Sequence, residues 1–394
     1  MKVLFLGYAV SSETNKNLTG KSEAGNKMEL SILYHLNKMV DQLDVITVYP
    51  IAPFPKDSLL IVRDEKIELG NDICSNRVGF FNIPIIKQIT QTISVYNAAA
   101  KITKRNKNVI VMSFNMYPQV GVPAVLLKKK YGCKVVPFLA DLPIDDNYQR
   151  KSISKWIRKV FNNITKKCIL NASDVIVLNK HARDVFAPKS RYLIVDGGFE
   201  PALYPADAGS EKSGDVGLEK HIVYTGSLAE YSGIMNLISS MKLIKNENIV
   251  LDIYGSGNLE SVVKKVDYKN VHYHGSVAHE KILAIQRNAW LLINPRPIDD
   301  EIAMVTFPSK IFEYMVSGTP VLTTRLNGFS DEYEGKLFFA DDNEPETLAC
   351  CINRLDLMTA EELKEVSQKA RDFVLEHKTW EKQMERVCQF LNDI

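Results

Sequence analysis

Short apolar segments alternate with longer segments of helical periodicity over almost the whole chain. In the first half, six apolar runs predict buried strands, at residues 2–9, 43–50, 109–115, 134–140, 174–179 and 192–198. Between them, the apolar side chains of residues 27–39 recur at helical spacing, at Met28, Ile32, Leu33, Leu36 and Met39. This alternation is typical of parallel α/β layers.

The segment from Glu200 to Lys220 interrupts the pattern with Pro, Gly, Ser and charged residues, which predicts a linker. The alternation then resumes, with strands predicted at residues 221–228, 249–257, 271–277, 290–297, 320–326 and 337–342. We therefore predict two Rossmann-like domains in tandem, covering residues 1–200 and 201–377.

Composition supports two folded domains. The chain has 394 residues, of which 45% are hydrophobic and 24% charged, so a disordered protein is not expected. Residues 1–200 hold 29 Lys+Arg against 17 Asp+Glu, whereas the remainder holds 20 against 30. The basic half favours an anionic surface or substrate.

The six cysteines form no C-x-x-C pair and no His-spaced set, so neither a zinc site nor a disulfide framework is predicted, and a reducing cytosol is the expected compartment. The opening MKVLFLGYAV is interpreted as a buried strand. No run of eighteen apolar residues predicts a transmembrane helix, so any membrane contact is expected to be peripheral.

Small residues follow several strands of the second half, where the loops of a parallel sheet bind ligands. They are Gly226, Ser227, Gly255, Gly257 and Gly275. Glycine there lets a ligand approach the backbone, but each position also fits an ordinary turn. The segment YGSGNLE lacks the third glycine of a dinucleotide fingerprint, so NAD binding is not predicted.

The segment FPSKIFEYMVSGTPV predicts a helix that begins near Pro308. Ser309 and Lys310 lie at its positive end, where free amides and a cation favour a polyphosphate. Glu313, one turn later, is placed to accept hydrogen bonds from a ribose diol. The alternative is a capping carboxylate paired with a lysine, a contact worth about 0.3–0.5 kcal/mol.

The order of HIVYTGSL, LDIYGSG, VHYHGSV, LLINPRP, PSK-x-x-EYM-x-SG-x-PV and KTW over residues 220–385 resembles glycosyltransferase family 4, specifically its PSK-x-x-EY subgroup. These are retaining enzymes of the GT-B fold, an α/β fold with two Rossmann-like domains whose parallel sheets face a central cleft. The resemblance also implies a C-terminal helix, at about residues 378–394 and including Trp380, that returns to the first domain.

The resemblance implies roles for particular residues. Glu313 would hold the nucleotide ribose and act in catalysis together with Lys310, which would face the diphosphate beside Ser309. Gly226 would approach the phosphates, and the loop after Gly275 would frame the base. The remaining nucleotide-sugar contacts are expected at Gly25, Ser227, Gly255, Gly257, Asn294 and Arg296.

The sequence departs from the family at two places. Val305 occupies the position of the first glutamate of the Glu-seven-residues-Glu motif, so the contact to the donor sugar is unassigned. Ser227 and Ser232 stand where the family carries Arg and Lys. Lys310 and Arg296 are candidates to replace these cations, although Arg296 fits equally well as an ion-pair partner of Asp299, Asp300 or Glu301.

Two features of the first half match the resemblance. Gly25 and Asn26 precede a predicted helix start in KSEAGNKM, in a loop that the family places near the donor phosphates and the acceptor. Asp141, in FLADLP, ends a predicted strand and is a third candidate catalytic residue; a turn aspartate before proline is the alternative.

The function implied is a metal-independent, hexosyltransferase-like retaining enzyme with no cofactor. The donor would be a nucleoside-diphosphate sugar, a UDP- or GDP-sugar, and the acceptor a glycan or a polyprenyl-diphosphate-linked glycan. Bacterial surface polysaccharide synthesis (capsule, exopolysaccharide or O-antigen) is the expected process. We expect a cytoplasmic protein that is peripheral at the inner face of the cell membrane.

Residues 153–170 predict a helix with one apolar stripe, formed by residues 153, 156, 157, 160, 161, 164 and 168. Lys155, Arg158, Lys159 and Lys166 lie on the opposite face. Such a helix suits an anionic membrane surface, or it packs on the sheet with its charges in solvent.

Two rival functions stay open. A sugar-nucleotide epimerase of the GT-B fold would need paired acids and bases, of which no set is recognisable. A noncatalytic or nucleic-acid-binding protein would use the basic half, but its basic tracts lack interleaved aromatic residues, so nucleic acid is not an expected partner.

Overall fold

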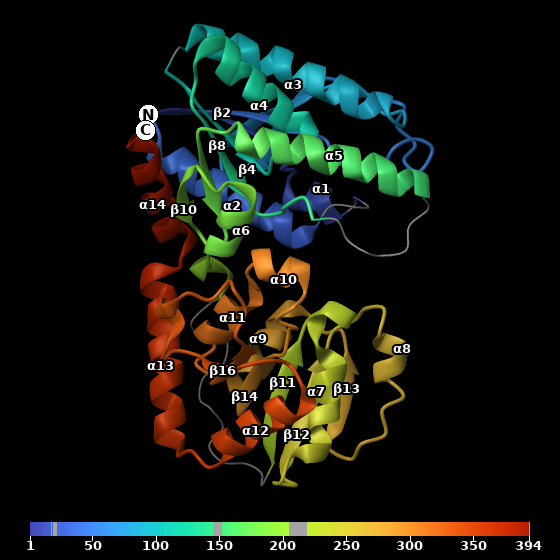
Figure 1. Ribbon diagram of the computed structural model, residues 1–394, viewed down its shortest axis with the longest axis vertical. Helices are drawn as coiled ribbons and strands as arrows, with labels where there is room; N and C mark the ends of the chain where they lie inside the picture. Colours follow the sequence, from blue (N-terminus) through green and yellow to red (C-terminus); the bar gives the residue numbers. More distant parts are fainter. Residues whose placement is uncertain (17, 19–21, 107, 145–151, 205–218, 394) are drawn as a thin grey trace. The chain divides into compact units, whose positions relative to one another are not determined.

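The computed structural model describes residues 1–16, 18, 22–106, 108–144, 152–204 and 219–393 (Figure 1). The chain divides into two compact units, one formed by Met1–Gly197 and Trp380–Ile394 and the other by Gly198–Thr379. The division therefore lies two to three residues from the boundaries predicted near residues 200 and 378. Most of the linker predicted between Glu200 and Lys220 lies outside the described residues.

The first unit contains an eight-stranded sheet in the order β10-β9-β8-β7-β1-β2-β5-β4. Its strands are β1 (Lys2–Gly7), β2 (Gln42–Val48), β4 (Glu65–Gly70), β5 (Ile73–Val78), β7 (Ile110–Phe114), β8 (Val135–Leu139), β9 (Asp174–Val177) and β10 (Arg191–Ile194). Neighbouring strands pair in parallel, except that β4 runs antiparallel to β5. The apolar residues of the central strands are fully buried because helices cover both faces of the sheet.

The six strands predicted in this half are confirmed, but the β4–β5 hairpin was not predicted. Its residues read as polar, with Glu65, Lys66 and Glu68 among them. The turn carries three successive residues of positive φ, Gly70, Asn71 and Asp72, and Asn and Asp at such positions are a hairpin signal. Strand β3 (Ile61–Val62) precedes this hairpin and β6 (Phe80–Phe81) follows it, and the two pair as a short antiparallel ribbon.

Helices α3 (Ile86–Arg105), α4 (Pro118–Tyr131) and α5 (Ser152–Leu170) lie side by side over one face of this sheet (Figure 1). Helix α2 (Glu23–Met39) packs against α14 (Trp380–Asn392), so the end of the chain returns to the first unit. The shorter helices are α1 (Ser12–Lys16) and α6 (Lys180–Phe186).

The second unit contains a six-stranded parallel sheet in the order β13-β12-β11-β14-β15-β16. Its strands are β11 (Lys220–Thr225), β12 (Ile249–Tyr254), β13 (Val271–Gly275), β14 (Leu291–Asn294), β15 (Val321–Thr324) and β16 (Phe338–Ala340). All six correspond to strands predicted from the sequence. Strand order reverses at β11, because successive strands extend first toward β13 and then toward β16. That reversal marks the point where such sheets bind ligands.

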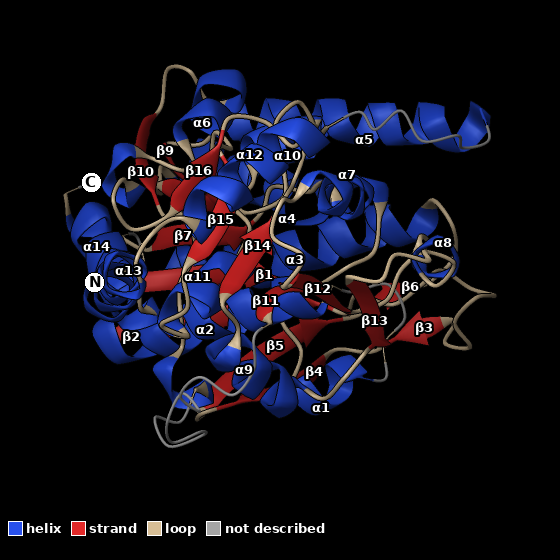
Figure 2. Cartoon of the chain, turned by 90° about the horizontal axis from the view of Figure 1, so that it is seen from below, coloured by secondary structure: helices blue, strands red, loops and turns tan. Residues whose placement is uncertain are grey.

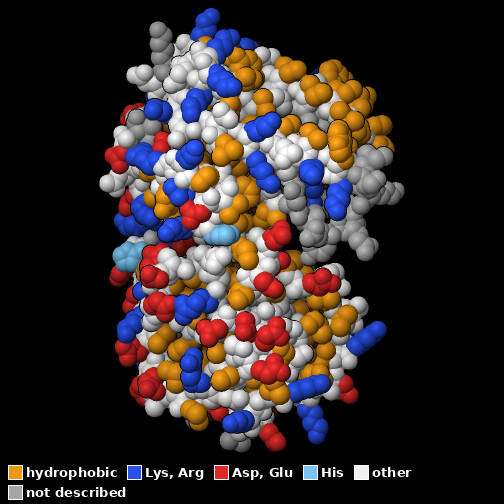
Figure 3. Space-filling view, viewed as in Figure 1, with side chains coloured by type: hydrophobic (Ala, Val, Ile, Leu, Met, Phe, Trp, Pro, Cys, Tyr) orange, Lys and Arg blue, Asp and Glu red, His pale blue; other side chains and the backbone are white. Residues whose placement is uncertain are grey.

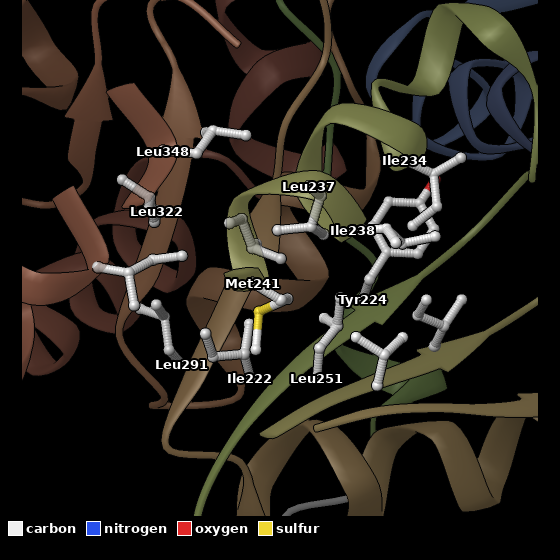
Figure 4. Close-up of a cluster of buried hydrophobic side chains, with 14 of the residues drawn as sticks. Ile222, Tyr224, Ile234, Leu237, Ile238, Met241, Leu251, Leu291, Leu322 and Leu348 are labelled. Atoms are coloured by element: carbon white, nitrogen blue, oxygen red, sulfur yellow. The ribbon is translucent and has the colours of Figure 1, made fainter. Parts of the chain in front are cut away.

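Helices cover both faces of this sheet as well (Figure 2). They are α7 (Ile234–Ser240), α8 (Glu260–Val263), α9 (His279–Asn288), α10 (Glu301–Val305), α11 (Lys310–Val316), α12 (Pro345–Asp356) and α13 (Ala360–His377), with short 3-10 turns η1 (Pro201–Leu203), η2 (Glu230–Ser232), η3 (Met241–Leu243) and η4 (Asp331–Tyr333). Ile222, Tyr224 and Leu251 form a buried cluster with α7 and α12 (Figure 4). This core fixes the end of β11, where the candidate site begins.

Candidate functional site

The loops that follow β11 and β12 pack backbone against backbone. Gly226 has a φ of +144°, and its N–H donates to the Tyr254 carbonyl over 3.0 Å. A Cβ on Gly255 would lie 1.8 Å from the Gly226 oxygen, and one on Gly257 would lie 2.3 Å from the Leu228 oxygen. Gly255 and Gly257 are therefore required for loop packing at the strand ends, in addition to any ligand contact.

Gly275 has a different environment. Its φ is +76°, and among the described residues a Cβ built there would meet only the Tyr273 hydroxyl oxygen, at 4.0 Å. This glycine provides a left-handed turn at the end of β13 and is not held by close packing.

Tyr314 fixes helix α11 to the carboxyl end of β11. Its fully buried hydroxyl accepts a hydrogen bond from the Thr225 N–H at 3.0 Å and lies 3.1 Å from the Thr225 carbonyl. Lys310 lies one helical turn before Tyr314 and so projects on the same face. Its Nζ donates to the Thr225 carbonyl over 3.4 Å and lies 3.5 Å from the position of a Cβ on Gly226. Lys310 and Gly226, which were each expected to face the donor phosphates, therefore lie next to each other within the second unit.

Lys310 is a cation in an unfavourable environment. Its Nζ lies 4.3 Å from the centre of the Tyr224 ring. Burial, and then the neighbouring Arg296 guanidinium, lower the pKa of Lys310 to about 7, while the Glu313 carboxylate opposes them. Two neighbouring cations, one partly desolvated, are stabilised when an anion binds between them.

Arg296 follows β14 and lacks the ion pair that was one of its two predicted roles. Within the described part of the chain it makes no ion pair, and its buried Nε has no hydrogen-bond partner. Burial lowers the pKa of Arg296, and Asp300 opposes this shift from a distance. The Asp300 carboxylate is used elsewhere, because it caps α10 by accepting from the Ala303 N–H over 2.8 Å. A buried unpaired guanidinium donor is costly, and an anionic ligand would satisfy it.

Glu313 has a partner that the sequence did not reveal. The hydroxyl of Tyr204, which follows η1, interacts with the Glu313 carboxylate: burial, and then this carboxylate, raise the pKa of Tyr204. The Tyr204 ring contacts Phe199, with 4.5 Å between centroids, and meets His279 edge to face at 5.8 Å. Tyr204 therefore joins the Glu313 carboxylate to α9, which follows the Gly275 loop.

The other predicted residues of this unit differ in exposure. Ser309 is exposed and makes no capping side-chain hydrogen bond, and Ser227 is exposed and accepts from the Tyr231 hydroxyl over 3.1 Å. Asn294 is fully buried in β14, where its amide donates to Thr323 over 2.9 Å. The structure therefore places Asn294 in the sheet interior, because residues at the end of β14 pair with β15.

Two further residues shape this region. Val305 is 5% exposed within α10, so the position of the missing glutamate is apolar and buried. Gly233 has a φ of +72°, and a Cβ there would lie 1.7 Å from the Pro295 carbonyl. The loop before α7 thus closes directly on the backbone next to Arg296. The sequence signal for this contact was only the isolated glycine in EYSGIM.

In the first unit, Asp141 belongs to a separate polar cluster at the ends of β7 and β8. Asn115, with a φ of +61°, accepts hydrogen bonds from the N–H groups of Ala140 at 2.9 Å and Asp141 at 2.7 Å. The Asp141 carboxylate lies 3.4 Å from the Asn115 amide and 3.5 Å from the Tyr117 hydroxyl. Desolvation raises the pKa of Asp141, and these two hydrogen bonds oppose the rise. Asp141 therefore makes side-chain contacts with Asn115 and Tyr117 that a simple turn aspartate would not need.

Gly25 lies in the first turn of α2, where its N–H donates to the N-cap Ser22 over 3.2 Å. The following turn holds the loop after β1. Asn26 accepts from the Val10 N–H, and the fully buried Glu29 accepts from Tyr8 at 2.6 Å and Ala9 at 2.9 Å. Neither side-chain role was predicted, because both depend on which loop α2 meets.

Among the described residues, no group of three or more His, Cys, Asp or Glu side chains could hold a metal ion. Nor is any described helix both long and apolar enough to cross a membrane.

The family model for group 1 glycosyl transferases matches residues 219–356, which contain β11 to α12 and the second-unit residues considered above, except Phe199 and Tyr204. No curated protein sequence matches the chain. Solved structures that are similar to this chain include sucrose-phosphate synthase from Thermosynechococcus elongatus, with a TM-score of 0.67 and 16% identity, covering 100% of this chain and 99% of the other. They also include Anabaena HepE in complex with UDP, with a TM-score of 0.68 and 16% identity over 100% of both chains.

This chain has the GT-B fold. A glycosyltransferase from Rickettsia africae extends the likeness, with a TM-score of 0.62 and 13% identity over 100% of this chain and 98% of that one. The predicted fold class is therefore confirmed, and the predicted relationship is confirmed as far as the group 1 glycosyl transferase match and this fold. The GT-B fold locates the candidate site of the second unit at the carboxyl end of β11, where Lys310 and Arg296 lie.

Proposed function

We propose that this protein is a retaining glycosyltransferase that moves a sugar from a UDP- or GDP-sugar to a hydroxyl of a glycan or lipid-linked glycan. The observation that supports this most directly is the position of Lys310 over Gly226, next to an Arg296 whose Nε has no hydrogen-bond partner in the part of the chain that the structure describes. Support also comes from the group 1 glycosyl transferase match over residues 219–356 and from HepE, whose structures contain UDP and UDP-glucose.

In this proposal the two cations bind the donor diphosphate. As the glycosidic bond breaks, negative charge grows on the leaving diphosphate, and cations already fixed in a partly desolvated site stabilise that charge without reorganising. They would take the place of the family's Arg and Lys, whose positions are Ser227 and Ser232 here. Charge neutralisation by these side chains is the basis for proposing that the reaction needs no metal.

Glu313 would accept hydrogen bonds from the ribose diol of the donor. Its carboxylate lies on the same helix as Lys310, so one rigid element would hold both the ribose and the diphosphate. In the retaining route, the leaving diphosphate takes the acceptor proton on the same face of the sugar, and no protein base is required. Asp141 is proposed to bind the acceptor hydroxyl, because its carboxylate is held by the Asn115 amide and the Tyr117 hydroxyl at the end of β8.

The process and location are part of the same proposal. We place the enzyme in bacterial surface polysaccharide synthesis, in the cytoplasm and at the inner face of the membrane. All six cysteines are free thiols, which agrees with a reducing compartment.

A thermal-shift screen of nucleoside diphosphates and their sugar conjugates tests the donor. We expect stabilisation by one nucleotide-sugar class, and its loss in Lys310→Gln and Glu313→Gln but not in the control Lys364→Gln on the exposed face of α13. Transfer to glycan acceptors, followed by NMR of the anomeric proton, should then show retained configuration and a slower rate in Asp141→Asn with unchanged donor affinity. Equal thermal shifts with nucleotide in the wild type, Lys310→Gln, Glu313→Gln and Lys364→Gln would contradict the proposal.

A further inference from the structure

Helix α3 in the first unit exposes large apolar side chains. The row that faces the protein contains Lys87, Gln91, Val95, Ala99 and Thr103, all buried. The outward face of its first half also carries isoleucine, with Ile89 56% exposed and Ile93 53% exposed. Large apolar side chains that gather on an exposed face favour a partner outside the unit.

The apolar surface continues from α3 onto the β3–β6 ribbon. The Phe81 N–H donates to Thr90 of α3 over 3.2 Å, which places the ribbon against the helix. Ile61 pairs with Phe81 across the ribbon, and both side chains are about half exposed. A groove of about 490 Å³ between the ribbon and α3 is lined by these two residues, by Ile93 and by the oppositely charged neighbours Arg63 and Asp64.

The loop before the ribbon adds further large apolar side chains. Phe54 is 42% exposed, and Leu59 and Leu60 are each 46% exposed. Asn82, which follows β6, ties this loop down: its amide donates to the carbonyls of Leu59 and Ala52. The loop therefore presents its apolar side chains at a fixed position next to those of α3.

Charge identifies the partner. Helices α3, α4 and α5, which share one face of the sheet, contain twelve Lys and Arg and no Asp or Glu. Lys87 is buried, and the other eleven are partly or fully exposed: Lys101, Lys104, Arg105, Lys128, Lys129, Lys130, Lys155, Arg158, Lys159, Lys166 and Lys167. Figure 3 shows orange apolar side chains gathered over α3 and the adjoining part of α5, with blue basic side chains next to them. An apolar surface surrounded by positive charge matches an anionic lipid bilayer.

The predicted apolar stripe of α5 is partly exposed and partly buried. Trp156 is 66% exposed and Val160 38% exposed, while Cys168 is buried next to Gly121 of α4. Only the later part of the stripe packs on the unit, and Ile153 lies outside the residues whose side chains are described. The exposed tryptophan belongs to the layer of α3 and α4, and tryptophan is favoured at the boundary between lipid and water.

We infer that the outward face of α3, the β3–β6 ribbon and Trp156 of α5 form a single surface that inserts into the headgroup region of an anionic membrane. The inference rests on the membrane location given in the proposed function. Vesicle binding needs no nucleotide, so it can be measured independently of glycosyl transfer. A second copy of the chain is the less favoured occupant, because a two-fold contact through this surface would bring basic helices to face each other. Nucleic acid would leave the isoleucines exposed to water.

Vesicle sedimentation tests the inference. The full-length protein should bind vesicles of phosphatidylglycerol and phosphatidylcholine, and Ile89→Gln/Ile93→Gln should lower the partition coefficient about thirtyfold, since each isoleucine has half of its side chain left to bury. The matched control is Leu357→Gln in the second unit, where an 87% exposed leucine is removed with no expected change. Lys155→Gln/Lys159→Gln should lower binding to the anionic vesicles by a similar factor at low salt and have little effect with pure phosphatidylcholine.

Thermal unfolding of each variant checks that the fold is intact. Unchanged sedimentation of the double isoleucine variant would overturn the inference. A wild-type dimer in analytical ultracentrifugation that this variant converts to monomer, without vesicle binding by either protein, would assign the surface to a second copy instead. A failed donor titration with intact vesicle binding would reject the proposed function and leave this surface standing.

Discussion

The pKa of Lys310 makes donor affinity depend on pH in a specific direction. In the free protein, burial and Arg296 lower this pKa to about 7. A bound diphosphate would add two negative charges beside the ammonium and raise its pKa, so the donor binds the protonated form and takes up a proton. Affinity is therefore full below pH 7 and falls as the pH rises above it.

The size of the effect follows from the two protonation states. If the pKa of the complex is above 9, the dissociation constant of a nucleotide sugar should rise about tenfold between pH 6 and pH 8, because the protonated fraction of free Lys310 falls by that factor. A nucleotide sugar is the better probe than a free nucleoside diphosphate, since its phosphates are both diesters and do not titrate in this range, whereas a terminal phosphate does.

Isothermal titration calorimetry in buffers of different ionisation enthalpy measures both the affinity and the proton uptake. Lys310→Arg keeps the charge at every pH and should flatten the dependence, and Lys310→Gln should bind weakly at all pH values. An affinity that is constant from pH 6 to pH 8 in the wild type, with no proton uptake, would refute the assignment of Lys310 to the diphosphate.

Three further substitutions test the site and its scaffold. Arg296→Gln should weaken nucleotide-sugar binding about tenfold or more in the same calorimetric assay, because a charge-assisted hydrogen bond is lost, without lowering the melting temperature. Tyr204→Phe should raise the KM for the donor with little change in kcat if its hydroxyl orients Glu313, and kinetics that match the wild type would show that it does not. In urea unfolding, Gly233→Ala should lower the free energy of unfolding by more than about 2 kcal/mol, because the new Cβ would overlap with Pro295. Gly335 has a φ of +71° with open space around it, so Gly335→Ala should lower the free energy of unfolding by about 1 kcal/mol.

Much of the fold could be predicted because parallel strands are buried on both faces and read as continuous apolar runs. That pattern located every parallel strand of both sheets except β5. The β4–β5 hairpin lies at the edge of its sheet, where polar residues such as Glu65 and Lys66 hide the strand pattern, so only the turn at Gly70 to Asp72 could have revealed it.

The site could be predicted where its residues share one helix. Lys310 and Glu313 are three residues apart, so helical geometry alone places them together. The environment of Arg296 was left open, since it depends on whether Asp300 pairs with it or caps α10, and both were compatible with the sequence. Tyr204 was missed because it lies in a segment read as linker, 109 residues from Glu313 in the chain, and such a contact requires the folded unit.

Glycines illustrate the same limit. Gly255, Gly257 and Gly275 each follow a strand in a similar sequence context, yet the first two are confined by the backbone of Gly226 and Leu228 and the third is not. Local sequence indicates where a loop turns, whereas the packing of one loop on another is determined by the sheet.

A crystal structure with a bound nucleotide sugar tests the central claim most directly. The account predicts that the diphosphate lies within hydrogen-bond distance of the Lys310 ammonium and the Arg296 guanidinium, with the ribose hydroxyls on Glu313. A nucleotide sugar bound elsewhere on the chain, with Lys310 still directed at the Thr225 carbonyl and no contact between Arg296 and the ligand, would contradict it.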